Sequence, residues 1–276
     1  ESSAASDVYK RQAHYQNWDY FQQCYQSLLD QTYKDFEIII VDDCSQDDSY
    51  QKLQELAAQN PSIQLYQNQE NKGVGFTKNR LLSLATGDVF GFVDPDDALE
   101  KTALEEMKNC YENNPSIVAV YSQMLLCDDD LQPLRLFERT SKIPANDQLF
   151  VNINTSIAHF FTLRKEAFQQ IENIDITLKS AVDQDLYLKL YEVGPFYYLP
   201  KPLYLYRLHE KGVSQQKNKD SAKDDFKKVI RNTLERRGVE ELDGKLLQDL
   251  SNDEVYQILS KRENSLFKKL QRKIGW

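Results

Sequence analysis

The stretch VFGFVDPDD, residues 89–97, joins a short apolar run to three carboxylates. The five residues before Asp94 are apolar or glycine and include two β-branched valines, which is typical of a buried strand. Three aspartates within four residues repel one another unless a cation or good solvation compensates their charge. The stretch therefore predicts a strand whose end holds either a metal ion or a solvated turn that caps a helix from Leu99.

Apolar runs and helical periodicity alternate on both sides of this stretch. Helices between successive strands imply right-handed crossovers, and hence an α/β fold with a mostly parallel sheet. The predicted strands are 36–41, 63–66, 89–93 and 117–121, and the predicted helices are near 21–29, 50–57, 81–85 and 99–111. Ligands of such sheets bind beyond the carboxyl ends of the strands, where the acidic clusters at 42–43 and 94–97 both lie.

The second half of the chain is more mixed. Its predicted elements are strands at 134–139, 196–199 and 203–208, a helix at 183–191, and helical stripes after residue 214. Ser251 and Glu254 have the spacing of a capping box, and Leu266, Leu270 and Ile274 form a last apolar stripe. We therefore expect flanking helices plus a C-terminal helical extension.

Composition restricts the class of protein. The net charge is −9, which argues against a dedicated nucleic-acid binder, and 41% of the residues are hydrophobic, which suffices for a sizeable core. The four cysteines form no CxxC pair, and no apolar run approaches the roughly 20 residues of a membrane span. These features favour a globular cytoplasmic protein with reduced thiols.

Two further motifs are weak on their own. The DDCS sequence at 42–45 reads as the cap of a helix beginning near Asp48, or as a carboxylate that accepts a hydrogen bond from a nucleobase. Residues 71–80, NKGVGFTKNR, form a turn entering a helix with basic residues, a place where phosphate can bind, although P-loop and dinucleotide spacings are lacking.

Together these motifs resemble glycosyltransferase family 2 from Tyr15 through Leu99, and less tightly to Ser214. The resemblance implies an inverting enzyme with the Rossmann-like GT-A fold. The matching segments are AHYQ at 13–16, DQTY at 30–33, DDCS at 42–45, NKG to KN at 71–79, ATGD at 85–88, DPDD at 94–97, DQDL at 183–186 and YRLH at 206–209. The first six of these, from AHYQ to DPDD, are each weak, but six in family order over about 85 residues are highly specific.

The resemblance also implies roles for individual residues. Tyr15 would stack on the nucleobase, Asp43 would accept from its ring N–H, and Asp94 would reach the ribose. Lys78 stands where the family usually has arginine, so its phosphate contact would be a point charge. The implied nucleotide-sugar site is Tyr15, Asp43, Asn71, Gly73, Lys78, Asp94 and Arg207, and the implied Mn²⁺ or Mg²⁺ ligands are Asp96, Asp97 and His209.

Asp183 is the general base that the resemblance implies. The alternative is that Asp183 caps the helix that follows it, and Val182 departs from the glutamate that the family often carries there. His159 follows an apolar stretch, so we expect it to be packed, with contact to the acceptor as the alternative.

The two ends of the chain depart from the pattern. Residues 1–12 resemble translated sequencing-adapter sequence, so we expect a non-native tail, with a disordered native tail as the alternative. If these residues are foreign, the sheet would lack a central strand and its neighbouring strands would expose unpaired edges. Residues 261–276 carry a net charge of +5, so they form either a helix packed on the domain or one that contacts anionic membrane.

These observations predict four segments: the tail 1–12, a nucleotide-sugar-binding half 13–125, an acceptor-binding half 126–214 and the extension 215–276. We expect a metal-dependent hexosyl- or N-acetylhexosaminyl-transferase. It would move sugar from a nucleoside-diphosphate sugar, most simply a UDP-sugar, to a saccharide or lipid-linked acceptor in surface polysaccharide or glycolipid synthesis. The alternatives are a nucleotide-sugar-binding module impaired in catalysis and a sugar nucleotidyltransferase.

Overall fold

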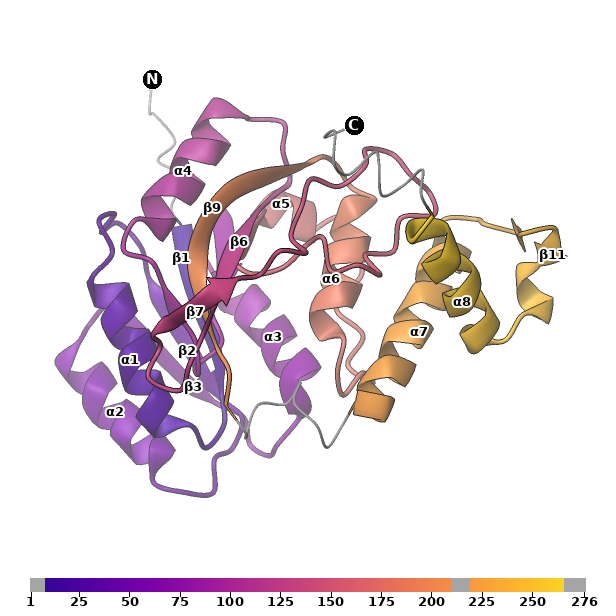
Figure 1. Ribbon diagram of the computed structural model, residues 1–276. Helices are drawn as coiled ribbons and strands as arrows, with labels where there is room; N and C mark the ends of the chain where they lie inside the picture. The colour runs from indigo at the N-terminus through magenta and orange to yellow at the C-terminus, as the bar shows by residue number, and fades with distance from the viewer. Residues whose placement is uncertain (1–7, 210–218, 266–276) are drawn as a thin grey trace.

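A nine-stranded sheet with helices on both faces organises the protein (Figure 1). The computed structural model describes residues 8–209 and 219–265. Its strand order is β3-β2-β1-β4-β8-β6-β9-β5, with β7 paired to β6. The strands are β1 (Val8–His14), β2 (Ile38–Asp42), β3 (Ile63–Gln67), β4 (Val89–Phe92), β5 (Ala98–Leu99), β6 (Ala119–Cys127), β7 (Pro133–Leu136), β8 (Phe161–Arg164) and β9 (Phe196–Arg207). The helices are α1 (Trp18–Leu29), α2 (Ser49–Gln59), α3 (Gly73–Leu84), α4 (Ala103–Asn113), α5 (Lys165–Phe168), α6 (Val182–Tyr191), α7 (Lys219–Arg236) and α8 (Asn252–Glu263).

The parallel part of the sheet is the part that the sequence predicts. Strands β1 to β4 pair in parallel, with α1, α2 and α3 in the connections, so their carboxyl ends share one edge. Strand β8 then runs antiparallel to both β4 and β6, while β9 is parallel to β6. The α/β fold is therefore confirmed, with antiparallel pairs concentrated in the second half.

Strand β1 differs from the expectation of a missing central strand. Its backbone lies between β2 and β4, with Lys10 opposite Ile38 and Val8 opposite Val89. Sheet pairing uses main-chain groups, which every non-proline residue supplies, so a polar sequence can occupy this position. The neighbouring strands consequently have no unpaired edge here, while the foreign origin of residues 1–12 stays a prediction.

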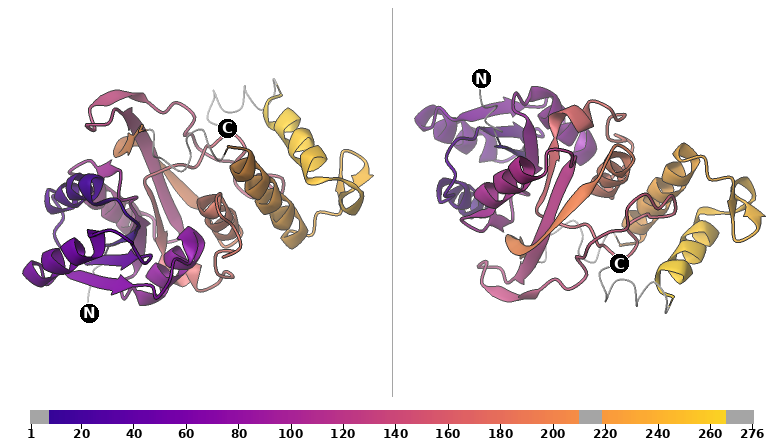
Figure 2. Two further views of the ribbon diagram at one scale, coloured as in Figure 1. Left: turned by 90° about the horizontal axis from the view of Figure 1, so that it is seen from below. Right: turned by 90° about the horizontal axis from the view of Figure 1, so that it is seen from above.

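The sheet separates two apolar cores, and helices lie on both of its faces (Figure 2). In β2, Ile38 and Ile40 face the core under α1, α2 and α4, whereas Ile39 and Val41 face the core under α3 and α6. Alternate residues of a strand point to opposite faces, so the uninterrupted apolar run of β2 serves both cores. This double burial fixes the strand that delivers Asp43 to the edge of the sheet.

Two boundaries differ from the prediction near the site. Residues 98–99 form β5, antiparallel to β9, and helix α4 begins only at Ala103. The two strands expected at 196–199 and 203–208 form the single strand β9, in which Pro200 and Pro202 coincide with register shifts against β6. Prolines lack the N–H that a ladder needs and are accommodated at such irregularities.

The C-terminal extension packs on α6 through α7, and α8 packs on α7. The predicted capping box at Ser251 and Glu254 is confirmed, and a short hairpin, β10 (Glu241–Leu242) and β11 (Lys245–Leu246), precedes it. Across the described parts of the chain, no helix combines the length and apolar character that a membrane span requires. The apolar stripe from Leu266 lies outside the described residues.

Candidate active site

Asp43 lies directly after β2 and binds the start of α3. Its Oδ1 accepts hydrogen bonds from the Lys72 backbone N–H at 2.9 Å and from the Asn68 amide at 2.7 Å, and its Oδ2 accepts from the Gly73 N–H at 2.8 Å. Gly73 has a φ of +81°, which a residue without a Cβ adopts readily. A carboxylate has about four acceptor positions, so these bonds leave capacity for a nucleobase N–H.

The loops that follow β1 and β2 are joined beside Asp43. Ser45 accepts from the Gln16 backbone N–H at 3.0 Å, and its own hydroxyl donates to the Asp42 carboxylate at 2.5 Å. Tyr15 is 43% exposed at this junction. Asn71 is exposed, and its side chain accepts from the Gly73 N–H at 3.2 Å. The structure thus brings four of the predicted nucleotide-binding residues together: Tyr15, Asp43, Asn71 and Gly73.

Lys78 forms ion pairs with both Asp94 and Asp183, which are 89 residues apart in the sequence. Its Nζ donates to the Asp183 Oδ1 at 2.5 Å and lies 3.9 Å from the Asp94 Oδ1. The ammonium also lies 5.2 Å from the centroid of the Phe92 ring. Because Lys78 is almost fully buried, its charge acts on both carboxylates in an environment that water screens little.

The pKa values of Asp94 and Asp183 are shifted in opposite directions, although both carboxylates face Lys78. Burial raises the pKa of Asp94 above its ordinary value, and Lys78 and His159 only partly oppose this. Burial also tends to raise the pKa of Asp183, but the charge of Lys78, helped by His159, outweighs it and holds the pKa below its ordinary value. For Lys78, burial lowers the pKa, but Asp183 and Asp94 outweigh it and raise the value. Asp183 is therefore ionised near neutral pH.

Neither Asp183 nor the 94–97 cluster caps a helix. Asp183 is the second residue of α6; the N-cap is Ala181, in the left-handed region with φ 56°, and its side chain makes no capping bond. Helix α4 has Thr102 at its N-cap, well beyond Asp97. The capping alternatives for Asp183 and for the 94–97 cluster are therefore wrong.

Asp96 meets His209 where β9 ends. The His209 Nε2 lies 2.9 Å from the Asp96 Oδ2, and the Tyr20 ring packs against the imidazole edge-on at 4.8 Å between centroids. The His209 Nδ1 is buried and has no hydrogen-bond partner within the described part of the chain. This pair presents one carboxylate and one imidazole at the carboxyl edge of the sheet.

Asp97 and Arg207 lie behind this pair, inside the protein. Asp97 is buried; its Oδ2 accepts from the Tyr204 hydroxyl at 2.7 Å and its Oδ1 from the Arg207 backbone N–H at 2.8 Å. Burial raises the pKa of Asp97 well above its ordinary value. The Arg207 guanidinium donates to the Asp96 carbonyl at 2.6 Å, to the Asp129 carbonyl and to the Gln23 side chain. Both side chains thus support the Asp96 loop from the protein interior. That Asp97 binds the metal and that Arg207 contacts the nucleotide sugar stay predictions.

His159, which the sequence predicted to be packed with acceptor contact as the alternative, lies beside the site. Its Nε2 lies 3.9 Å from the Asp94 Oδ2, and its ring stacks on Tyr204 at 4.9 Å between centroids. The apolar residues before it indicated packing, which is correct for the ring face. The sequence carries no signal that the packed ring also faces a carboxylate from β4.

A divalent cation fits this edge only if substrate phosphates complete its coordination. Across residues 8–209 and 219–265, no group of three or more His, Cys, Asp or Glu side chains could hold a metal ion. Asp96 and His209 offer two donor atoms, and among residues 8–209 and 219–265 the second imidazole nitrogen, Nδ1, has no hydrogen-bond partner. Mg²⁺ and Mn²⁺ sites of phosphate-using enzymes commonly combine one or two protein ligands with substrate phosphates, which agrees with this donor set.

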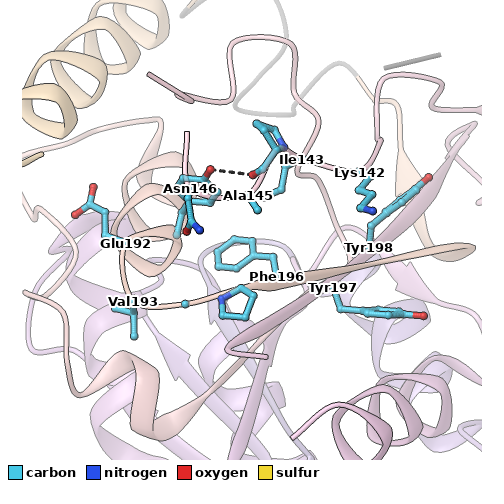
Figure 3. Close-up of a pocket in the computed structure, with 13 residues that line it drawn as sticks. Lys142, Ile143, Ala145, Asn146, Glu192, Val193, Phe196, Tyr197 and Tyr198 are labelled. Atoms are coloured by element: carbon cyan, nitrogen blue, oxygen red, sulfur yellow. Dashed lines mark hydrogen bonds between the residues drawn. The ribbon is translucent and has the colours of Figure 1, made fainter. Parts of the chain in front are cut away.

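A cavity of about 610 Å³ lies elsewhere, at the other end of β9 (Figure 3). It is lined by residues 142–146 and 191–198, including Lys142, Glu192 and Tyr197. Because β9 starts at Phe196 and ends at Arg207, this cavity is separated from the Asp96–His209 pair by the length of the strand. It does not contribute to the carboxylate site.

Comparison with protein families and known proteins identifies relatives of the chain. The family model described as "Glycosyl transferase family 2" matches residues 13–172. The chondroitin synthase of Escherichia coli is 32% identical over 247 residues, which cover 90% of this chain and 35% of that protein. The chain thus spans about a third of the length of that relative.

Two solved structures show the same fold at low sequence identity. S. aureus TarS 1-349 in complex with UDP-GlcNAc superposes with a TM-score of 0.66 at 21% identity, covering 94% of this chain and 72% of that chain. The mannosyltransferase PcManGT of Pyrobaculum calidifontis, in complex with GDP-Man and Mn²⁺, gives a TM-score of 0.60 at 14% identity, covering 99% of this chain and 82% of that chain.

Proposed function

Because the chain belongs to glycosyltransferase family 2 and has the GT-A fold, we propose that it transfers a sugar from a nucleoside-diphosphate sugar to an acceptor hydroxyl with inversion. The observation that carries the proposal is the meeting of Asp183, Lys78 and Asp94 beside the Asp96–His209 pair. The acceptor that we propose is a growing surface polysaccharide or a glycolipid. The similarity to a chondroitin synthase and to a structure holding UDP-GlcNAc supports a UDP-hexose or UDP-N-acetylhexosamine donor.

Asp183 is the proposed general base. Its Oδ1 is held by Lys78, and across the described residues its Oδ2 has no hydrogen-bond partner. In the proposed step Oδ2 takes the proton of the acceptor hydroxyl as the hydroxyl oxygen bonds to the anomeric carbon. The bond from that carbon to the diphosphate oxygen breaks on the opposite side, so the configuration inverts.

Asp96 and His209 are the proposed protein ligands of Mn²⁺ or Mg²⁺, with Asp97 supporting the loop that carries Asp96. When bound, the cation would neutralise charge on the departing diphosphate. Arg207 contributes by fixing the main chain at Asp96 through its bond to the carbonyl.

The nucleoside is proposed to bind above β1 and β2. Tyr15 offers an exposed ring for stacking, and Asp43 offers its remaining acceptor positions to the ring N–H. Asn71 and Gly73 shape the turn that leads into α3, and Asp94 reaches the ribose from the end of β4.

Assays of donor turnover test this function. Purified protein is incubated with a panel of UDP- and GDP-sugars and Mn²⁺, with and without saccharide acceptors, and nucleoside diphosphate release is measured. We expect release with one donor class, stimulated by acceptor. Donor binding without release would instead identify a binding module, and formation of a nucleotide sugar from a sugar phosphate and a nucleoside triphosphate would identify a nucleotidyltransferase.

Membrane contact by residues 261–276 also stays a proposal, since residues from 266 onward lie outside the described part. Flotation with anionic liposomes, with and without these residues, tests it. Loss of flotation on their removal would support peripheral binding, and unchanged behaviour would oppose it.

A further inference from the structure

Helix α3 presents one face to the segment that carries Asp183. Gly75, Lys78 and Asn79 have the i, i+3 and i+4 spacing that puts residues on one side of a helix. All three contact the segment 174–183. This contact surface is independent of the turn at Asn71 and Gly73.

Asn79 and Gly75 fix the distance between the two segments. The Asn79 amide donates to the Ile174 carbonyl at 2.8 Å, and its oxygen accepts from the Ile174 N–H at 3.0 Å. A Cβ at position 75 would lie 3.3 Å from the Asp175 carbonyl oxygen, which is tighter than nine in ten such contacts. The main chain before α6 therefore approaches α3 closely enough for Lys78 to reach Asp183.

The Lys78 ammonium is already surrounded by protein groups. Asp183 lies at 2.5 Å, Asp94 at 3.9 Å and the Phe92 ring beneath it, and the side chain is 4% exposed. An ammonium has three N–H donors, but at this low exposure a diphosphate would reach Lys78 only if the side chain moved away from a carboxylate that it neutralises. Removing one partner of a buried ion pair leaves an uncompensated charge, which is strongly unfavourable.

We infer that Lys78 is a positioning residue for the general base, which occupies Oδ1 of Asp183 and aims Oδ2 at the acceptor, and does not bind the donor diphosphate. The inference rests on the proposed role of Asp183 and extends it. The groups that face Asp183 are Lys78 from α3, Asp94 from the loop after β4, and His159 from the segment before β8, with Tyr187 on α6 itself. Among them, Lys78 makes the direct contact with Asp183.

The test is the pH profile of kcat in Lys78→Met and Lys78→Arg. The lysine charge keeps Asp183 ionised into acidic solution, so its removal should move the acidic limb of kcat upward by about one to three pH units. Lys78→Arg retains the charge and should keep the limb near its original position. The Kd for UDP in Mn²⁺ should stay within about threefold in both variants, because less than 1 kcal/mol of binding energy would be lost. Lys108→Met, which removes a surface lysine paired with Glu112, is the matched control.

An unchanged acidic limb with a tenfold or greater rise in the Kd for UDP would overturn the inference and assign Lys78 to the diphosphate. A second measurement applies even if a variant does not fold or the protein shows no turnover. The ¹³C-carboxyl resonance of Asp183, followed against pH in the unaltered protein, should report a pKa below the usual value of about 3.9. A normal or raised value would contradict the inference, while full turnover by Asp183→Asn would instead refute the proposed function.

Discussion

The His209 imidazole lies 2.9 Å from the Asp96 carboxylate, although 113 residues separate them in the chain. Asp96 follows β4, and His209 follows β9, which reaches this edge beside β5. Arg207 holds the Asp96 carbonyl, and the ring of Tyr20 packs against the imidazole. The two side chains are thus fixed from both sides before any ligand binds, as a preorganised site requires.

Substitution of the paired residues should remove metal dependence. We expect Asp96→Asn and His209→Ala each to lower donor turnover by about a hundredfold or more, because several kcal/mol of charge stabilisation by the cation is lost. Mn²⁺ titrations of nucleoside diphosphate release measure the effect, and a chelator should abolish activity of the unaltered protein.

Asp88→Asn, at an exposed residue directly before strand β4, is the matched control and should behave like the unaltered protein. Full activity of Asp96→Asn in the presence of chelator would contradict the assignment of this pair.

Asp97→Asn should act on stability. Its carboxylate accepts from two donors, the Tyr204 hydroxyl and the Arg207 N–H, whereas an amide presents one acceptor oxygen and one donor group. Leaving one buried donor unsatisfied should lower the free energy of unfolding by about 1 to 3 kcal/mol. Thermal and urea unfolding measure this change, and an unchanged stability with lost Mn²⁺ binding would show that Asp97 is a metal ligand instead.

Gly91→Ala tests the packing beneath the site. A Cβ at this position of β4 would lie 2.7 Å from the Phe160 ring, which is fully buried. Such overpacking should destabilise the protein by about 1 to 3 kcal/mol, measured by urea unfolding. Phe160→Leu in the same chain makes room and should recover part of the loss; equal instability of the single and double variants would argue against this contact.

Tyr15→Ala tests the nucleobase platform. Stacking of a base on an aromatic ring contributes about 1 to 3 kcal/mol, so the Kd for UDP should rise roughly five- to 150-fold. Tyr15→Phe keeps the ring and should bind like the unaltered protein. Calorimetric titration with UDP measures both, and normal affinity of Tyr15→Ala would move the nucleobase away from this ring.

Much of the parallel half was predictable from local patterns. The apolar runs of β2, β3 and β4 and the periodicity of α1 and α2 match the structure to within a few residues. These elements are predictable because burial of each strand or helix face leaves a direct mark on its own sequence. The order of acidic clusters after β2 and β4 then indicated the edge where the site lies.

The remaining features depend on contacts between distant segments. Main-chain pairing makes β1 a central strand without an apolar signature, and β9 continues through Pro200 and Pro202 because its partner β6 shifts register. The sequence likewise could not distinguish the inward Asp97 from the outward Asp96, because adjacent aspartates carry the same signal. His159 reaches Asp94 only through the pairing of β8 with β4.

The most direct test of the account is the activity of Asp183→Asn with its preferred donor, acceptor and Mn²⁺. General-base catalysis contributes about 10²- to 10⁴-fold, so transfer should fall by that factor while the Kd for UDP stays unchanged. Retention of full transfer by Asp183→Asn would contradict the assignment of the base and, with it, the proposed chemistry of this site.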